Sequence, residues 1–342
     1  MLTKKLGYGI VKVLKQKELL MTQVSSNPFK FSDTNKRYYT YEYYLRKTFG
    51  EKCAKITLDC GFTCPNIDGT VSRGGCIYCD SGSQSVNCRQ VKDIKEQYEI
   101  GIENARKKWN VKKFIPYMQA YTNTHTSPEN LEKITSEIAS LEGAVMINIA
   151  TRADCLENEK IEILNKLSEK IPVTVELGLQ SSNDQTAIII NRGHKFDVFV
   201  DCINRLRTLA PKVKIAIHII NGLPYENYDD MMKTAGDVAE LHPDVVKIHL
   251  LHIIRGTALY SMYKQGDYSP MERSDYIKTV CDQIEILPPD TVIERLTGDG
   301  VADRLVEPVW SRKKTTVIND IDKELYERNS YQGIFFQPLA DS

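Results

Sequence analysis

Short apolar runs alternate with segments of helical periodicity along most of the chain. Six runs, rich in β-branched residues and bounded by turn residues, predict strands over 55–59, 114–121, 145–151, 173–180, 213–220 and 245–252. Helical spacing of apolar residues predicts helices over 94–108, 128–141, 158–170, 184–191, 198–209 and 228–241. Nearly continuous apolar strands separated by helices are typical of a parallel α/β sheet. Because no G-x-G-x-x-G turn accompanies the pattern, it favours a partial (β/α)6 barrel of TIM-like type over a dinucleotide-binding fold.

Additional elements flank the predicted barrel. A segment rich in tyrosine and arginine, 33–49, predicts a helix over one end of the barrel. Its aromatic and basic residues would suit RNA, but packing of the tyrosines on the core is the favoured interpretation. Beyond the barrel we predict a helix from 274, a strand over 291–296 and a charged helix over 320–328. The predicted divisions are an N-terminal extension, 1–26, a helical lead-in, 27–54, the barrel core, 55–270, and a C-terminal α/β extension packed on the barrel, 271–342.

Composition and the N-terminal segment narrow the class of protein. Lysines interrupt the apolar stretch in residues 1–26 and no small-residue cleavage site follows, so we expect no signal peptide, and Met21 is an alternative start. No apolar run approaches the roughly 20 residues of a membrane span. Lys plus Arg and Asp plus Glu both number 45, so net charge gives no general attraction to nucleic acid. Nine cysteines without an export signal indicate a reducing cytoplasm.

Three cysteines, Cys64, Cys76 and Cys79, lie in a loop crowded with turn residues between the first strand and the first helix. Thiolates held in this way are suited to a metal ion or an iron–sulfur cluster. A structural zinc site usually takes four ligands, and Cys60 is the candidate for the fourth, although it equally fits a small buried apolar position. Three thiolates on a [4Fe–4S] cube would leave one iron open to a substrate or cofactor. The spacing alone leaves cluster and zinc equally open and makes a disulfide framework least favoured.

Polar residues recur where the predicted strands end. Because the carboxyl ends of parallel strands meet at one end of a barrel, we expect these side chains to share one cavity. A buried polar group without a partner is costly, so the set favours a ligand or a wet cleft over unrelated buried hydrogen bonds. The polar residues at or just after strand ends are Gln119, Thr122, Asn123, Arg152, Glu176, Gln180, His218, His249 and His252.

The cysteine loop resembles the cluster loop of the radical S-adenosylmethionine (SAM) enzymes. Most of these have C-x3-C-x2-C with an aromatic residue before the last cysteine, a place that Tyr78 fills. The first spacing here is eleven residues, and with C-P-N-x-D-G-T and G-G-C it is similar to that of one bacterial family. The nearest larger relative of that family is the radical SAM domain of the Elongator catalytic subunit. The resemblance runs from about Asn27 to Phe336 and implies a six-unit (β/α) barrel.

The resemblance also implies roles for individual residues. Cys64, Cys76 and Cys79 would hold a [4Fe–4S] cluster whose remaining iron binds SAM. Where relatives carry a G-G-E-like motif that contacts the SAM amino group, this chain has Ala120-Tyr-Thr-Asn-Thr. Arg192 is similar to an arginine that pairs with the SAM carboxylate, as the fork of a guanidinium allows. The implied SAM-binding residues are Tyr78, Gln119, Thr122, Asn123, Arg152, Glu176, Gln180, Arg192, His218, Gly222 and Pro224.

The implied reaction is radical chemistry on a nucleic acid. In enzymes of this type SAM is cleaved by one electron and the 5′-deoxyadenosyl radical takes a hydrogen atom from the substrate. The tie to Elongator implies the wobble uridine of tRNA, with a 5-carboxymethylaminomethyl group processed to 5-aminomethyl. Basic residues in 36–47 and 312–314 are candidate phosphate contacts, and His249, His252 and Arg255 are candidates for holding the base or its carboxylate. A cytoplasmic location and an electron donor such as flavodoxin or ferredoxin are implied as well.

Two alternatives stand beside this hypothesis. The first is a radical SAM enzyme that acts on a small molecule such as a tetrapyrrole, for which salt-dependent binding of tRNA is not expected. The second is a non-enzymatic zinc-binding module, which would be colourless after anaerobic purification, whereas a cluster gives brown protein.

Overall fold

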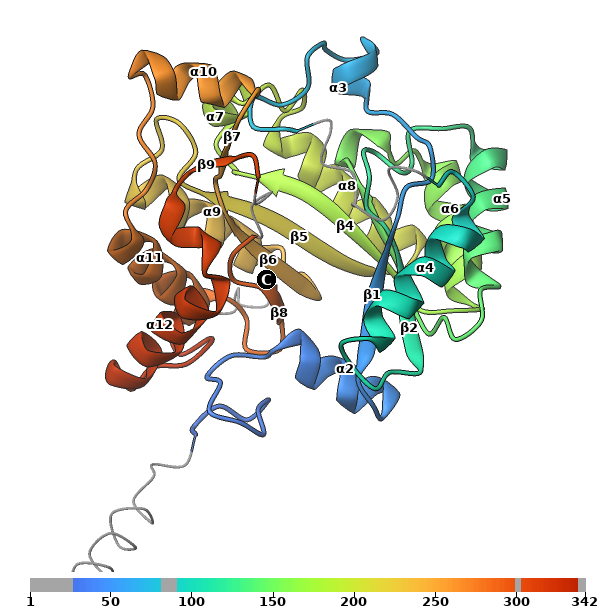
Figure 1. Cartoon of the computed structure of the whole chain (residues 1–342), viewed down its shortest axis with the longest axis horizontal. Coiled ribbons are helices and arrows are strands. Elements are labelled where there is room, and N and C mark those ends of the chain that lie inside the picture. The colour runs from blue at the N-terminus through green and yellow to red at the C-terminus, as the bar shows by residue number, and fades with distance from the viewer. Residues whose placement is uncertain (1–26, 81–90, 299–302, 338–342) are drawn as a thin grey trace, which may run out of the picture.

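A half-open barrel of parallel strands organises the chain (Figure 1). The computed structural model describes residues 27–80, 91–298 and 303–337, and the predicted N-terminal extension lies outside these ranges. Strands of the main sheet are all parallel and follow one another in chain order. They are β1 (Cys53–Leu58), β2 (Lys113–Met118), β3 (Ile147–Thr151), β4 (Val173–Gln180), β5 (Lys214–Asn221), β6 (Val245–Leu250) and β8 (Val292–Arg295). The predicted partial barrel is therefore confirmed.

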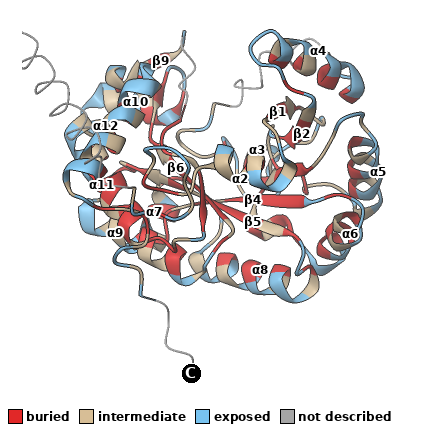
Figure 2. Ribbon diagram, turned by 90° about the horizontal axis from the view of Figure 1, so that it is seen from below, coloured by how far each residue is buried: buried red, intermediate tan, exposed pale blue. Residues whose placement is uncertain are grey.

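Helices cover the outer face of the curved sheet and turn their buried sides toward it (Figure 2). Those between consecutive strands are α4 (Ile94–Arg106), α5 (Pro128–Ala139), α6 (Asn158–Ser168), α7 (Asp184–Ile189), α8 (Phe196–Leu209) and α9 (Tyr228–Glu240). Side chains of Asp93, Ser127 and Asn227 cap the starts of α4, α5 and α9 by accepting backbone N–H bonds. The largest apolar cluster joins the helices to the strands, as where Phe199 of α8 belongs to the same cluster as Ile217 of β5.

The C-terminal part extends the sheet and covers one flank. Strand β8, from the segment that the sequence assigns to the extension after residue 270, pairs in parallel with β6. Helices α11 (Arg273–Ile286) and α12 (Lys314–Glu327) pack on each other beside α9. The sequence did not predict the short antiparallel pair β7 (Ile253–Ile254) and β9 (Leu305–Glu307), or α10 (Ala258–Gln265). The sheet thus continues one strand beyond the six predicted units.

The predicted helix over 33–49 is correct only in its second half. Helix α2 (Tyr41–Phe49) begins after Thr40, whose side chain accepts the Tyr43 N–H. Upstream, the Asn27 amide donates to two backbone carbonyls, so that side-chain hydrogen bonds hold a turn instead of a helix. Other boundaries shift less: the second strand ends at 118 instead of 121, the sixth ends at 250 instead of 252, and the last helix begins at 314 instead of 320.

Helix α2 closes the amino end of the half-barrel and contacts both of its edge strands, β1 and β8. Its side chains Tyr41 and Tyr44 pack against an apolar cluster that includes Ile115, and also against a second cluster that includes Val292. These two tyrosines therefore serve the core, which was the favoured interpretation of the segment. Within the part of the chain that the structure describes, no helix has the length and apolar character needed to cross a bilayer.

Gly101 marks a close approach of α4 to the sheet. A Cβ there would lie 2.3 Å from Cγ2 of Ile56 on β1. We expect Gly101→Ala to lower the free energy of unfolding by about 1–3 kcal/mol, because the overlap outweighs the gain in helix propensity. Gly236→Ala in α9, where nothing lies within 4 Å, is the matched control and should raise it by about 0.5–1 kcal/mol. Chemical denaturation measures both, and equal stabilities would contradict the close contact.

Candidate active site

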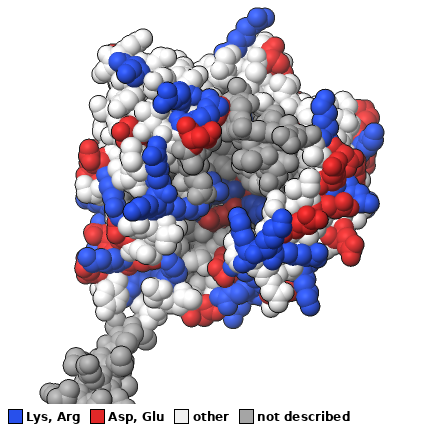
Figure 3. Space-filling model, viewed as in Figure 1, with Lys and Arg blue, Asp and Glu red and all other residues white. Residues whose placement is uncertain are grey.

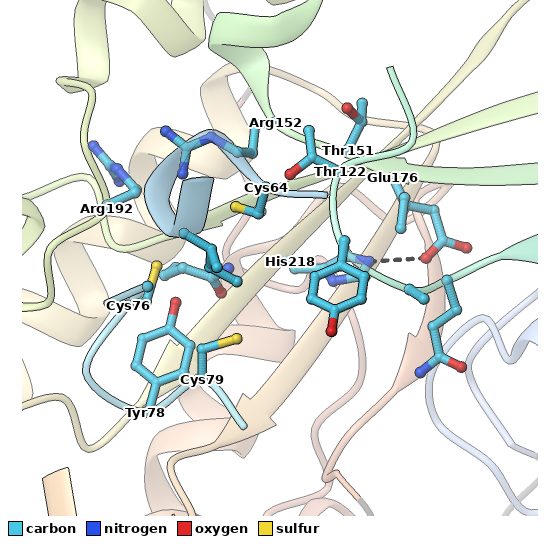
Figure 4. A pocket seen from close by; sticks show the side chains of 18 of the residues that line it. Cys64, Cys76, Tyr78, Cys79, Thr122, Thr151, Arg152, Glu176, Arg192 and His218 are labelled. Atoms are coloured by element: carbon cyan, nitrogen blue, oxygen red, sulfur yellow. Dashed lines mark hydrogen bonds and ion pairs between the residues drawn. The ribbon is translucent and has the colours of Figure 1, made fainter. Parts of the chain in front are cut away.

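A cavity of about 300 Å³ opens at the carboxyl ends of β1 to β5, with the cysteine loop as one wall (Figure 4). This is the end of a (β/α) barrel at which active sites form. Several elements far apart in sequence meet here, as the sequence predicted. The predicted residues that line the cavity are Cys64, Cys76, Tyr78, Cys79, Gln119, Thr122, Arg152, Glu176, Gln180, Arg192 and His218.

The short helix α3 (Pro65–Asp68) shapes the cysteine loop. It starts directly after the first cysteine with a proline, whose missing N–H costs nothing at that position. The Asn66 amide in this helix donates to the carbonyl oxygens of Asn191 (2.6 Å) and Arg192 (3.0 Å), and its nitrogen lies 3.7 Å from the Cys76 sulfur. The cysteine loop is therefore attached to the turn that follows α7.

That turn makes the reciprocal contacts. The Asn191 amide nitrogen donates to the Gly75 carbonyl (2.8 Å), and its oxygen accepts the Ser72 hydroxyl (2.9 Å). Gly193 has a φ of +89°, and a Cβ there would lie 2.7 Å from the Asn66 side-chain oxygen, so the turn requires glycine. The Asn-Arg-Gly sequence thus holds the cysteine loop in position.

The Arg192 guanidinium is committed to the backbone. It donates to the carbonyls of Leu179 and Ser181 at 2.5 Å each, and twice to the His194 carbonyl, at 3.1 and 2.9 Å. The residue is only 2% exposed. Because four of the five N–H groups of an arginine are used in this way, the fork has no free pair of donors for the SAM carboxylate expected from the resemblance. In this structure Arg192 positions the turn instead.

Electrostatics and geometry of the three thiols suit a shared cationic centre. Burial raises the pKa of Cys76 and Arg152 lowers it, whereas burial, followed by Cys76 and Cys64, raises the pKa of Cys79 to about 12. Ionising all three thiols together requires a cation to offset their repulsion. Figure 4 shows Tyr78 between Cys76 and Cys79, with Cys64 across the same space. Three thiols around one space, with no fourth cysteine among the cavity-lining residues that the structure describes, fit a [4Fe–4S] cluster that keeps one iron open.

A network of buried charges lies at the base of the cavity. Burial alone would raise the pKa of Glu176, but Lys55 and Lys247 outweigh it, and the pKa lies well below its usual value. Both lysines also pair with Glu294 on β8, at 2.5 and 3.0 Å. The Glu176 carboxylate is thus ionised and held from four other strands. Its hydrogen-bonding partners are Lys55 (3.0 Å), Asn148 (2.6 Å), His218 (3.0 Å) and Lys247.

Sequence reasoning did not single out Lys55, Lys247 or Glu294. A usable signal was present, because both lysines interrupt runs that otherwise predict buried strands. A charge in such a place is costly unless an opposite charge accompanies it. Two buried lysines on separate strands therefore require carboxylates between them, which Glu176 and Glu294 supply.

Three predicted SAM contacts stand away from the cavity lining. The Asn123 amide donates to three backbone carbonyls and so fixes the turn after β2. Gly222 and Pro224 follow β5, and the Gly222 carbonyl accepts the Tyr268 hydroxyl at 2.7 Å. Contacts of these residues with SAM stay predictions.

The predicted substrate contacts lie on the β6 side of the barrel. The His249 ring is 5.3 Å from that of His218, which lines the cavity. A Cβ on Gly298 would lie 3.6 Å from both His249 and His252, so these two histidines adjoin the chain after β8. Arg255 is exposed, and its backbone pairs with Arg304. The structure therefore brings the two histidines together but leaves Arg255 on the outside.

Comparison with known proteins identifies the family. The model of the Radical SAM superfamily matches residues 69–238, and that of the Radical SAM C-terminal domain matches residues 243–327. The uncharacterized protein YtqA of Bacillus subtilis is 43% identical over 93% of this chain and 98% of its own length. The chain belongs to the radical SAM superfamily. Its cofactors are accordingly a [4Fe–4S] cluster and SAM, and the radical SAM enzyme predicted from the cysteine loop is confirmed at this level.

More distant relatives include proteins related to the Elongator catalytic subunit. A tRNA uridine(34) acetyltransferase of Methanocaldococcus infernus is 26% identical over 69% of this chain, which spans about half of that protein, 51%. The solved structure of Elp3 from the same organism, with residues 1–46 deleted, superposes with a TM-score of 0.63 at 20% identity. The superposition covers 82% of this chain and 64% of the Elp3 chain, so the two proteins share a fold. The predicted relation to the Elongator catalytic subunit is confirmed.

Proposed function

We propose that this radical SAM enzyme acts on the wobble uridine of tRNA and converts a 5-carboxymethylaminomethyl side chain to 5-aminomethyl. SAM would be the oxidant: the carbon next to the carboxylate loses a hydrogen atom and a further electron, and water splits the resulting C=N bond to release the carboxymethyl group as glyoxylate. The observation that carries the proposal is the 26% identity with a tRNA uridine(34) acetyltransferase over 69% of this chain. Position 34 is the wobble nucleotide. Because the match covers most of the barrel's length in sequence, a related binding mode for the same nucleoside is the simplest explanation.

The residues of the cavity have distinct tasks in this proposal. Cys64, Cys76 and Cys79 would hold the cluster, and the strand ends around Gln180 would hold SAM. When bound, these cofactors supply the one-electron chemistry that removes a hydrogen atom from the substrate, with electrons from a flavodoxin- or ferredoxin-like donor. The chain itself keeps the loop in place, and Arg152, which lowers the pKa of Cys76, offsets the negative charge of the thiolates.

The side of the cavity next to β7 and β9 fits the approach of an RNA. Lys and Arg side chains gather on both sides of the centre of this face (Figure 3). Arg304, just before β9, pairs with Asp80 of the cysteine loop at 2.7 Å, so β9 lies beside the loop. Arg255, Arg312 and Lys313 are exposed near this strand pair and are suited to phosphates. The segment 36–47, the other predicted phosphate contact, leads into α2 at the opposite end of the barrel from the cavity.

Nucleosides from the tRNA of a strain lacking the gene test the proposal. We expect 5-carboxymethylaminomethyluridine to accumulate and 5-aminomethyl derivatives to disappear, with the wild-type gene reversing both changes. Purified protein should also bind tRNA with an affinity that falls steeply as salt rises. Wobble nucleosides that are unchanged by the deletion would reject the proposal, and a lack of tRNA binding would favour a small-molecule substrate.

A further inference from the structure

An irregularity in β8 brings two consecutive charged residues to the inner side of the barrel. Val246 on β6 pairs with Ile293, but Lys247 pairs with Arg295, so Glu294 is an extra residue in β8. Such a bulge changes the direction of the side chains beside it. Glu294 points inward, because its carboxylate lies 3.0 Å from the Lys247 ammonium. Arg295, as the partner of Lys247 in register, faces the same side of the sheet.

Arg295 differs from Lys55 and Lys247 because its side chain has no partner among the residues that the structure describes. The network described above contains two carboxylates, Glu176 and Glu294, and two lysines, Lys55 and Lys247, which pair with them. The Arg295 side chain makes no hydrogen bond or ion pair within residues 27–80, 91–298 and 303–337. Counting only the residues that the structure describes, the inner side of β6 and β8 therefore carries a positive charge in excess, and the Arg295 guanidinium is available to bind an anion.

His249 adjoins this free cation. Burial, followed by the positive charge of Arg295, lowers the pKa of His249 well below its usual value, so the imidazole is neutral. Its Nε2 atom is buried and has no hydrogen-bonding partner in the described chain. A buried polar atom without a hydrogen-bonding partner lowers the stability of the protein, and a bound ligand that hydrogen-bonds to it would remove that cost. The ring lies 5.3 Å from His218 on the cavity wall, so the free groups adjoin the proposed reaction site.

We propose that Arg295 and His249 form a subsite for a carboxylate carried by the substrate. The guanidinium fork matches a carboxylate with two parallel N–H bonds, and a neutral imidazole can donate a third. The inference rests on the proposed function, in which the uridine side chain ends in one carboxylate. The SAM carboxylate would bind at the cluster, whose cysteines lie in the loop after β1, so it would not compete for this place. Arg295 thus takes the role that the sequence assigned to the exposed Arg255.

Binding of two matched RNAs to the anaerobic, cluster-loaded enzyme tests the subsite. One anticodon stem-loop carries 5-carboxymethylaminomethyluridine, and the other carries the isosteric carboxamide, which lacks the charge. We expect wild-type enzyme to prefer the acid by about tenfold to a hundredfold, as for a charge-assisted hydrogen bond. Arg295→Gln should reduce that preference to within about twofold, and Arg295→Lys should retain part of it, since a lysine keeps the charge without the fork. Arg106→Gln, exposed at the end of α4, is the control and should behave as wild type.

The outcomes separate the subsite from the function. An acid preference that persists in Arg295→Gln overturns the subsite while leaving the tRNA activity intact. Equal weakening of both RNAs by Arg295→Gln also overturns it, because the residue would then contact a phosphate common to both. Loss of SAM binding in the same variant would assign Arg295 to the cofactor instead. Iron content and melting temperature of each variant show that the protein is folded, and the nucleoside analysis of the deletion strain judges the proposed function separately.

Discussion

Replacing Cys79 with alanine is expected to abolish cluster binding and, with it, all cleavage of SAM. The thiol is one of three that face the cavity, and burial together with the neighbouring Cys76 and Cys64 raises its pKa, so a free thiolate is disfavoured there. A [4Fe–4S] cluster with only two protein ligands would be lost on purification. Iron and sulfide analysis under anaerobic conditions should fall from about four of each per chain to near zero. Product formation should fall below detection together with the brown colour.

Cys60→Ala is the matched control for this experiment. Cys60 precedes the loop and packs against the main apolar cluster instead of lining the cavity. We expect it to keep full iron content and to lose at most the small stability that one partly buried sulfur supplies. A colourless Cys60→Ala protein would make Cys60 a ligand, and a brown Cys79→Ala protein would contradict the assignment of Cys79.

Lys247→Met is expected to destabilise the protein strongly. The Lys247 side chain is 3% exposed and sits between the carboxylates of Glu176 and Glu294. Removing one cation from a buried network leaves negative charge without compensation, at a cost of about 3–5 kcal/mol. For a domain of this size the melting temperature should fall by roughly 5–15 °C. Thermal unfolding of the cluster-loaded enzyme under anaerobic conditions gives the measurement.

Lys212→Met provides the comparison at an exposed ion pair. Its ammonium lies 2.8 Å from Glu169, but both side chains are more than half exposed. Water and salt screen such a pair, so the change in stability should stay below about 1 kcal/mol. If Lys247→Met and Lys212→Met melt at the same temperature, the interior charges are not a structural unit.

Local pattern in the sequence was sufficient for the barrel and for most of the cavity lining. Strands buried on both faces give apolar runs that stand out against helical spacing, so β4 was predicted to the residue. Because the carboxyl ends of parallel strands converge, the order of the strands was enough to group polar residues such as Gln119, Thr122 and Arg152 in one cavity. The spacing and setting of the three cysteines added the family, which composition and periodicity alone do not give.

Contacts between residues far apart in the chain could not be predicted from the sequence. The donors of Arg192 are taken by backbone carbonyls at the end of β4 and in the turn after α7, and no local pattern shows that. The inward direction of Arg295 depends on a register shift between β6 and β8, which only the paired strands define. In the same way, α2 starts at Tyr41 because side chains capture the backbone upstream, a competition that helix spacing does not reveal.

Helix α2 sets where the barrel can widen. Since Tyr41 and Tyr44 join apolar clusters of the first strands and of β6 and β8, separating those strands at their amino ends would expose both clusters to water. A motion that opens the barrel should therefore leave the amino ends together and separate the strands at their carboxyl ends, where the cavity lies. If the proposed function is correct, a nucleotide turned out of an RNA loop would enter at that end, and the closed amino end would limit how deeply it can enter.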